Sequence, residues 1–309
     1  MPERTIAKRR LRAAGGATAG LLVLGFGCYA YVQYLAGEQE PHCTVSAEDG
    51  SSFSLDPEQA ANASTIEAVA SARGLPERAV TIALATAMQE SGLHNLDYGD
   101  RDSLGLFQQR PSQGWGTEEE VLDPVYAAGA FYDRLVEISG YETMPLTEAA
   151  QAVQRSAFPD AYAKHEPQAA VLAAALTGRA PAALTCVLPA EGSGEDDGKP
   201  AGSTPEEVHA RMVREFGEGV TPSGEGAQLT VPVPEEAGPR RGWELAHWSV
   251  AHSAELGIER ITYGERVWEA ARSADGWREA PAGEGGDGAG QETAAGAADG
   301  VRLFLAAGR

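Results

Sequence analysis

The sequence predicts a mainly α-helical domain behind one N-terminal transmembrane helix, followed by a small α+β domain. Three observations lead to this fold class. Residues 13–36 form an apolar run without a charged side chain. Residues 43–189 show helical periodicity with Gly and Pro between the segments, and residues 228–309 combine an amphipathic helix with alternating strand patterns. Residues 190–227 are expected to be a linker that contains one helix, residues 204–216.

The run 13–36 is long enough to cross a bilayer. At about 1.5 Å per residue it spans a hydrocarbon core of about 30 Å. Residues 1–12 are basic, and the positive-inside rule keeps such a flank in the cytoplasm. We therefore expect a single-pass protein of the cell membrane, with a cytoplasmic N-terminus and the rest of the chain outside. Two alternatives stay open: a cleaved signal peptide, although residues 34–37 are a poor cleavage site, and a lipid attached at Cys28, although residues 25–27 do not fit the usual lipobox.

The charge of the chain limits its partners. A net charge of −21 argues against nucleic acid, because phosphate binding needs clustered Lys and Arg. Anionic membranes and anionic polymers would be repelled as well, whereas a neutral or zwitterionic polymer is easier to accommodate. The same excess of acid also fits an exported protein that is simply kept soluble.

Cys43 and Cys186 are the two cysteines outside the apolar run. A disulfide persists in an oxidising exterior, so we expect these two residues to pair around the helical domain. Two free thiols are the alternative.

Glycine and proline divide the helical domain. Ser64 is predicted to cap a first helix that ends at Gly74. A second helix begins at Pro76 and ends before Gly92, and it is apolar nearly all round, so it should be the buried central helix. Strand patterns are weak here, apart from short pieces around Leu106. Further helices are expected at residues 118–138 with a break near Pro124, 147–155 and 167–176.

The C-terminal domain is predicted from one helix and three strands. Four tryptophans in it, Trp243, Trp248, Trp268 and Trp277, are expected to form a packed core rather than a binding face. The helix is expected at residues 243–256, and the strands at 258–263, 266–270 and 301–306, with low-complexity sequence at 280–300.

Glu90 is the strongest candidate for chemistry. It ends the apolar helix, and Ala83 and Ala87 on the same face leave room for a cleft. Partial burial favours the protonated form of a carboxyl, which a general acid for glycosidic cleavage needs.

The loop after Glu90 supplies groups suited to sugars. Gln108 and Gln109 can hydrogen-bond hydroxyls and acetamides, and Tyr98, Phe107 and Trp115 can stack on pyranose rings. Ordinary loop and core positions are the alternative for each.

Glu90-Ser91-Gly92, followed by Ser-Leu-Gly-Leu-Phe-Gln-Gln at residues 103–109, resembles the lysozyme-like superfamily of lytic transglycosylases and goose-type lysozymes. The resemblance covers roughly residues 60–178 and is nearest to divergent actinobacterial forms. It implies Glu90 as the catalytic acid and Gln108 as a substrate contact. We also expect Ser91, Gln109, Tyr98 and Phe107 to bind substrate. The Ala-Ala-Tyr-Asn segment of the family is absent, and the nearest match, residues 157–162, gives its role to Tyr162.

The resemblance implies a glycosidase that cleaves the MurNAc-GlcNAc β-1,4 bonds of peptidoglycan glycan strands. In a lytic transglycosylase Glu90 takes a proton back from the C6 hydroxyl of the sugar and leaves a 1,6-anhydro end. In muramidase-type hydrolysis a second carboxylate activates water, and the candidates are Asp97, Asp100 and Asp102, with Asp102 nearest the Gly-Leu-Phe-Gln turn. The latter are also ordinary turn formers. No cofactor is expected, and the spacing of the histidines predicts no metal site.

The alternative to an enzyme is a lysozyme-like protein that has lost catalysis. Such a protein would bind peptidoglycan, or act as a scaffold in a secretion, conjugation or cell-wall complex, with protein partners that the sequence leaves unknown. Residues 242–277 resemble small C-terminal modules of actinobacterial cell-wall hydrolases, which favours a cell-wall setting for either function.

Overall fold

The computed structural model of this chain describes residues 40–155, 160–188, 202–224, 226–281 and 300–306. The predicted cytoplasmic tail and transmembrane run, residues 1–36, lie outside this part, as does most of the low-complexity segment. In the part that is described, no helix combines the length and apolar character that crossing a membrane requires. The helical segment (residues 43–188) and the C-terminal segment (residues 202–306) are described in turn.

A three-stranded antiparallel sheet opens and closes the helical segment. Its order is β2-β1-β3, with bounds of His42–Ser46 for β1, Ser52–Leu55 for β2 and Leu184–Val187 for β3. Cys43 and Cys186 stand opposite each other on β1 and β3 and form a disulfide across 143 residues of sequence. The predicted pairing of these cysteines is confirmed. The sheet itself was not predicted, because its strands have only four or five residues and β1 pairs with β3 over a long sequence distance.

The first helix, α2 (Pro57–Ala72), begins earlier than the sequence indicated. Asp56 caps it, and the side chain of Gln59 completes a capping box by accepting a hydrogen bond from the Asp56 backbone N–H. The predicted cap at Ser64 is wrong, because Ser64 is fully buried inside the helix. Helix α3 (Glu77–Glu90) follows from Pro76 as expected, and its residues 79–87 are all buried.

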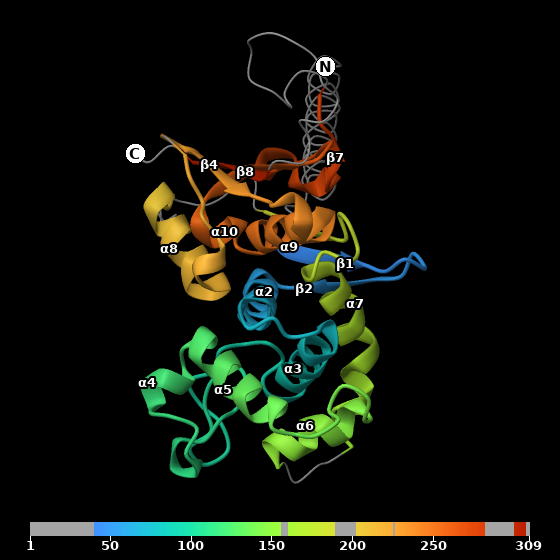
Figure 1. Cartoon of the computed structure of the whole chain (residues 1–309), viewed down its shortest axis with the longest axis vertical. Helices are drawn as coiled ribbons and strands as arrows, with labels where there is room; N and C mark the ends of the chain where they lie inside the picture. Colours follow the sequence, from blue (N-terminus) through green and yellow to red (C-terminus); the bar gives the residue numbers. More distant parts are fainter. Residues whose placement is uncertain (1–39, 156–159, 189–201, 225, 282–299, 307–309) are drawn as a thin grey trace, which may run out of the picture. The chain divides into compact units, whose positions relative to one another are not determined.

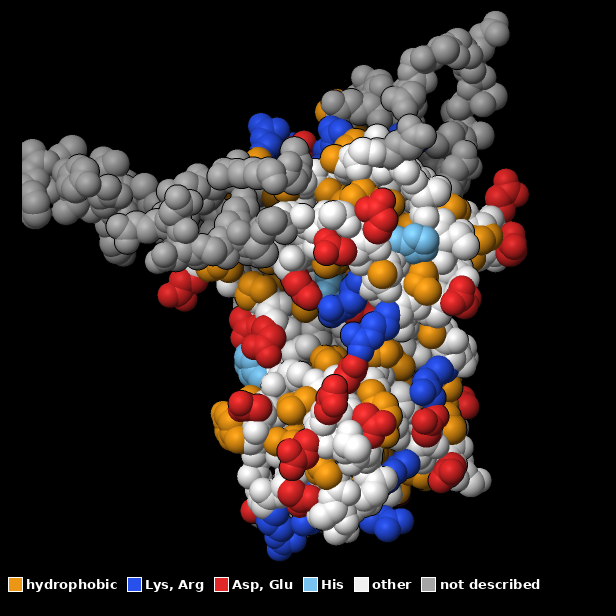
Figure 2. Space-filling model, turned by 90° about the vertical axis from the view of Figure 1, so that its left-hand side faces the viewer, with side chains coloured by type: hydrophobic (Ala, Val, Ile, Leu, Met, Phe, Trp, Pro, Cys, Tyr) orange, Lys and Arg blue, Asp and Glu red, His pale blue; other side chains and the backbone are white. Residues whose placement is uncertain are grey.

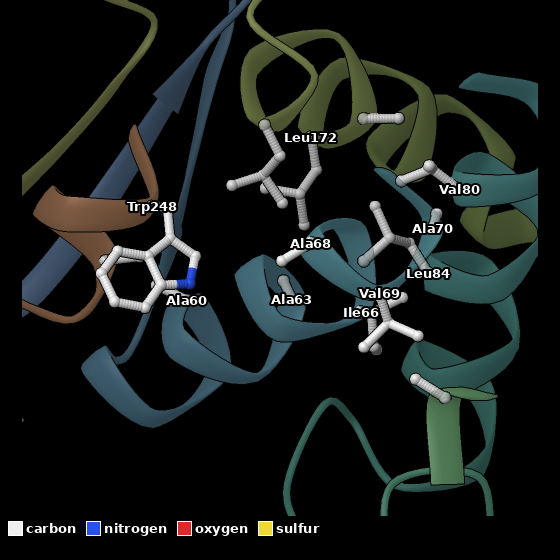
Figure 3. Packing of buried hydrophobic residues seen from close by; sticks show 14 of the residues in the cluster. Ala60, Ala63, Ile66, Ala68, Val69, Ala70, Val80, Leu84, Leu172 and Trp248 are labelled. Atoms are coloured by element: carbon white, nitrogen blue, oxygen red, sulfur yellow. The ribbon is translucent and has the colours of Figure 1, made fainter. Parts of the chain in front are cut away.

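Helix α3 lies at the centre and packs against α2, α5, α6 and α7. The predicted break near Pro124 is confirmed, since Thr117 and Asp123 cap two separate helices. Figure 3 shows Leu84 of α3 close to Ile66 of α2, and Val80 close to Ala70, in the apolar core. The bounds are Glu118–Val121 for α4, Pro124–Val136 for α5, Leu146–Gln154 for α6 and Glu166–Leu176 for α7.

The C-terminal segment places helices on an antiparallel sheet of order β4-β8-β5-β6-β7 (Figure 1). The predicted strands near residues 258, 266 and 301 are present, whereas β4 and β7 were not predicted. The predicted helix at 243–256 is α9 and α10, which begins at Gly238 and is interrupted at His252. The bounds are Pro205–Phe216 for α8, Gln228–Pro232 for β4, Gly238–Ala251 for α9, Ser253–Leu256 for α10, Ile258–Tyr263 for β5, Arg266–Glu269 for β6, Arg278–Glu279 for β7 and Gly300–Leu305 for β8.

Tryptophan side chains form much of the core of the C-terminal segment. Trp248 and Trp268 are fully buried, Trp243 is nearly so, and Trp277 is half-buried with its indole N–H donating to the Leu184 carbonyl at 2.9 Å. The packed core expected of these residues is confirmed, and it continues into the helical segment through Leu184 on β3.

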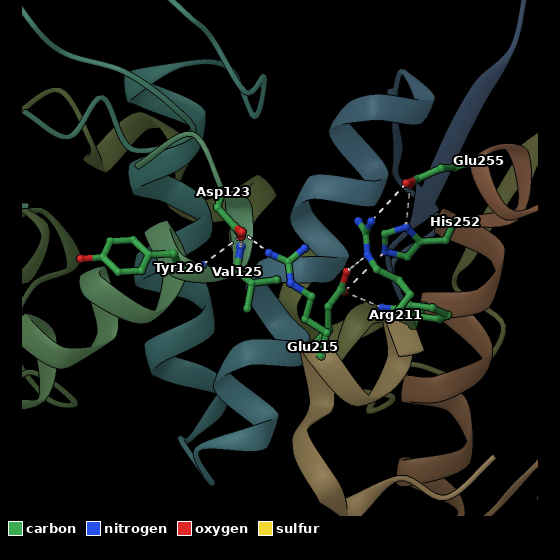
Figure 4. Close-up of polar contacts among 9 residues, drawn as sticks. Asp123, Val125, Tyr126, Arg211, Glu215, His252 and Glu255 are labelled. Carbon is green, nitrogen blue, oxygen red and sulfur yellow. Dashed lines mark hydrogen bonds and ion pairs between the residues drawn. The ribbon is translucent and has the colours of Figure 1, made fainter. Parts of the chain in front are cut away.

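Helices α8 and α9 also pack against α2 of the helical segment. Arg214 of α8 pairs with Asp123, the cap of α5, and Arg211 pairs with the buried Glu215, which accepts from the Trp248 indole N–H at 2.7 Å (Figure 4). The described residues from Glu40 onward belong to one compact unit.

Candidate active site

Glu90 is the last residue of α3, and Tyr162 lies against it. The Tyr162 phenol donates a hydrogen bond of 2.6 Å to Glu90 Oε1. The Tyr162 side chain is fully buried, whereas Glu90 is half-buried. The structure therefore brings together two residues that are 72 positions apart and that the sequence resemblance had paired in function.

Ser91 ties the end of α3 to the next loop. Its hydroxyl donates to the Leu106 carbonyl at 2.7 Å, with the Ala87 carbonyl of the preceding helical turn at 3.1 Å. Ser91 was predicted to bind substrate, but its hydroxyl proton is used within the protein. Its effect is to hold the Leu106 turn beside Glu90.

That turn is closed by backbone hydrogen bonds between Leu104 and Gln109. Gln108 at its tip has a φ of 46°, a left-handed conformation that is uncommon for a residue with a side chain. The Gln154 side chain of α6 donates to the Phe107 carbonyl at 2.7 Å. Gln154 thus holds the turn together with Ser91.

Two residues expected to face sugars are core residues. The Phe107 ring has no exposed surface and stacks on Phe131 with ring centroids 4.7 Å apart. Gln109 is 1% exposed, and its side-chain N–H donates to the Ala127 carbonyl at 2.9 Å. Neither side chain is accessible to a ligand, because both are buried in the core. Trp115 is likewise buried, beneath the Arg134 guanidinium.

The Gln108 side chain contacts the loop that carries Asp97, Asp100 and Asp102. Its side-chain nitrogen lies 3.2 Å from the Tyr98 carbonyl and 3.3 Å from the Gly105 carbonyl, both as a donor. Its Oε1 lies against the backbone of Gly99, where a Cβ atom would come within 1.9 Å of it. The amide that was predicted to contact a sugar therefore fixes the position of Tyr98.

Asp102 has its carboxylate oxygens engaged. The Ser112 backbone N–H donates to Oδ2 at 2.8 Å, and Arg110 Nε donates to Oδ1 at 2.7 Å. The hydrogen bonds from Ser112, followed by that from Arg110, hold the pKa of Asp102 far below its usual range. Such a carboxylate stays ionised and is a weak base, which makes Asp102 poorly suited to taking a proton from water.

An open pocket of about 450 Å³ lies beside this loop. Tyr98 is 68% exposed and contributes to its wall, together with Asp97, Arg101, Asp102 and Glu118. Glu90 is not among the lining residues. Figure 2 shows acidic side chains spread over one face of the molecule with basic side chains between them.

His165 is a neighbour of the site that the sequence did not single out. Its Nε2 lies 3.2 Å from Gln89 Oε1, next to Glu90 in the chain, and burial followed by the charge of Lys164 lowers its pKa. Gln154 was missed as well. The contacts of both depend on how α6 and α7 are placed, so no local pattern in the sequence marks them.

One group of possible metal ligands lies near the start of α2. His94 Nδ1 is 3.0 Å from Glu58, and His94 Nε2 is 3.5 Å from Asp56. The two ring nitrogens therefore face different carboxylates. The absence of a metal site stays a prediction.

The comparisons with known proteins concern the C-terminal segment. Residues 204–293 match the family described as VldE, C-terminal domain. The match begins at the cap of α8 and takes in β4, α9, α10 and β5 to β7, which is less than a third of the chain. No curated protein matches the chain. The lysozyme-like resemblance therefore depends on the residues around Glu90 themselves.

Proposed function

We propose that this protein is a membrane-anchored enzyme that cleaves peptidoglycan glycan strands outside the cytoplasm, with Glu90 as general acid and then base. The observation that carries the proposal is the 2.6 Å hydrogen bond from Tyr162 to Glu90. It joins the helix-ending Glu-Ser motif to the tyrosine that the resemblance assigns to the same site. The anchor is residues 13–36, and it is proposed from the sequence alone.

In the proposed reaction Glu90 transfers its proton to the oxygen of the MurNAc-GlcNAc bond. The bond from C1 to that oxygen breaks, the GlcNAc side leaves with the electron pair and the proton, and C1 becomes oxocarbenium-like. The Glu90 carboxylate then accepts the proton of the C6 hydroxyl of the same MurNAc, and that oxygen bonds to C1. Tyr162 orients the carboxyl for both steps by holding Oε1.

The anhydro product is favoured over hydrolysis. Hydrolysis with inversion needs a second carboxylate that accepts a proton from water. Asp102, the first candidate, is engaged by Arg110 and Ser112 and has a strongly lowered pKa. The intramolecular ending needs Glu90 alone, so it is the chemistry that we propose.

A second candidate function is a scaffold that binds glycan strands without cleaving them. The direction of Phe107, Gln108 and Gln109 into the protein favours it, because three side chains expected to grip a sugar are engaged elsewhere. The exposed Tyr98 and its pocket would then supply the binding surface, apart from Glu90.

The test is digestion of purified peptidoglycan by the full chain and by Glu90→Gln. We expect the wild type to release muropeptides with anhydro ends and the variant to release almost none. Equal release by both would refute the role of Glu90. Sedimentation with peptidoglycan but no release by the wild type would support the scaffold instead.

A further inference from the structure

Helices α2 and α9 pack against each other across the two segments, and each contributes a buried acidic side chain. Glu67 of α2 is 3% exposed and Glu244 of α9 is 8% exposed. A carboxyl at such a position is expensive to bury unless it is hydrogen-bonded, and two that are both ionised repel each other strongly. The pair therefore needs a proton or a cation.

Arg241 supplies the cation for one of the two. Its Nη1 lies 2.8 Å from Glu244 Oε2 and donates to Ser71 Oγ at 2.9 Å. Ser71 follows Glu67 by one helical turn, so both lie on the face of α2 that α9 covers. Glu67 and Glu244 are both buried in the contact of α2 with α9, where two neighbouring carboxyls can share a hydrogen bond only if one of them carries a proton.

The two segments are in tight contact around this pair. Gly178, after α7, is so close to α9 that a Cβ atom there would lie 1.9 Å from the Arg240 carbonyl oxygen. His247 of α9 approaches the Ala175 carbonyl to 2.7 Å. There is little space for water to solvate a second negative charge.

We propose that a single proton shared by Glu67 and Glu244 latches the C-terminal segment onto α2, and that loss of this proton loosens the contact. The latch is a property of the fold, and it holds whether or not Glu90 cleaves glycans.

The surrounding charges leave the pair one cation. From α9, Glu67 faces Glu244, Arg241 and Arg240, and from α5 it faces Tyr132. Arg240 is occupied by Glu77 at 2.9 Å, and Tyr132 stays neutral because burial raises its pKa. The other helices against α2 bring charges that already have partners: Glu215 of α8 with Arg211, and Glu77 of α3 with Arg179.

The proton on the Glu67–Glu244 pair determines how the stability of the fold changes with pH. Burial, followed by the charge of Glu244, raises the pKa of Glu67 well above its usual value. Below about pH 4 both the folded and unfolded chains hold this proton, so nothing is lost. As the pH rises toward the raised pKa, the unfolded chain gives up the proton first, and folding weakens by up to about tenfold per pH unit.

The experiment compares the full chain in detergent with Glu67→Gln between pH 5 and pH 9. Glutamine keeps an N–H donor for Glu244 and cannot ionise, so it imitates the latched state at every pH. Urea unfolding is followed by tryptophan fluorescence, which reports mainly the C-terminal segment because Trp243, Trp248, Trp268 and Trp277 lie there. We expect the folding constant of the variant to rise relative to the wild type as the pH rises, by at least tenfold over the range.

A matched control is Asp123→Asn, which alters a carboxylate that joins the same two segments and is already paired with Arg214. This variant should be less stable at all pH values, with a ratio to the wild type that stays level. Glu244→Gln serves if Glu67→Gln does not fold, since it also removes the repulsion and should reduce the pH dependence. Parallel pH profiles for the wild type and the Glu67 or Glu244 variant would overturn the proposal.

Discussion

Replacing Tyr162 by phenylalanine tests the candidate active site at its most specific contact. The change removes one hydroxyl and leaves the buried ring, so the packing around it is kept. The lost hydrogen bond is 2.6 Å long and ends on a carboxyl oxygen. Hydrogen bonds to charged groups contribute about 1.5–3 kcal/mol, which corresponds to a loss of about 10- to 150-fold in turnover if the contact persists in the transition state.

The assay is the initial rate of muropeptide release from purified peptidoglycan by the full chain. Tyr132→Phe is the control, because Tyr132 is also fully buried and its hydroxyl donates to a backbone carbonyl, that of Ile66, at 3.1 Å. The control should lose about 0.5–1.5 kcal/mol of stability and retain its rate. Equal rates for Tyr162→Phe and the wild type, with both folded, would show that this hydrogen bond does not serve the reaction.

Three further predictions follow from the contacts described. Gly99→Ala would place a Cβ atom 1.9 Å from Gln108 Oε1, so it should displace the loop and destabilise the protein by about 1–3 kcal/mol; an unchanged melting temperature would contradict the close approach. Reduction of the Cys43–Cys186 disulfide, which closes a loop of 143 residues, should lower the free energy of unfolding by up to about 4–5 kcal/mol, measured as a lower urea midpoint. Asp102→Asn should lower stability at neutral pH and lose its effect under acid conditions, because the lowered pKa of Asp102 stabilises the folded state above about pH 4 and the benefit disappears as the pH falls; a constant difference down to pH 2 would be inconsistent with this.

Local signals in the sequence predicted much of the helical segment. Pro76 and Gly92 delimit α3, and Pro124 separates α4 from α5. Each of these residues does so through the conformational preference of its own backbone. The position of Glu90 at the end of a buried helix follows directly from them. The start of α2 was misplaced because Ser64 is a possible cap in an alanine-rich stretch, whereas the Asp56 capping box lies eight residues earlier.

The parts that were missed depend on distant residues. Strands β1 and β3 have five and four residues and pair across the whole helical segment, so each is too short to be recognised on its own. The disulfide was nevertheless predicted, because Cys43 and Cys186 had no other partner in the exterior. The number of cysteines thus predicted the disulfide, although the strands that carry them were not predicted.

The direction of the side chains in the Leu106 turn was predicted least well from the sequence. The residue types of Phe107, Gln108 and Gln109 suggested contacts to sugars, but the side chains of Phe107 and Gln109 are buried in the core. The role of Gln108 as a clamp on Tyr98 follows from contacts that no motif encodes.

The mass of the products released from peptidoglycan by the full chain tests the central claim most directly. We predict anhydro-ended muropeptides, each one water lighter than a hydrolysis product, and their loss in Glu90→Gln. Reducing ends would show that a water is activated at the site, in conflict with the engaged state of Asp102. Release that continues in Glu90→Gln would contradict the assignment of Glu90 as the proton donor.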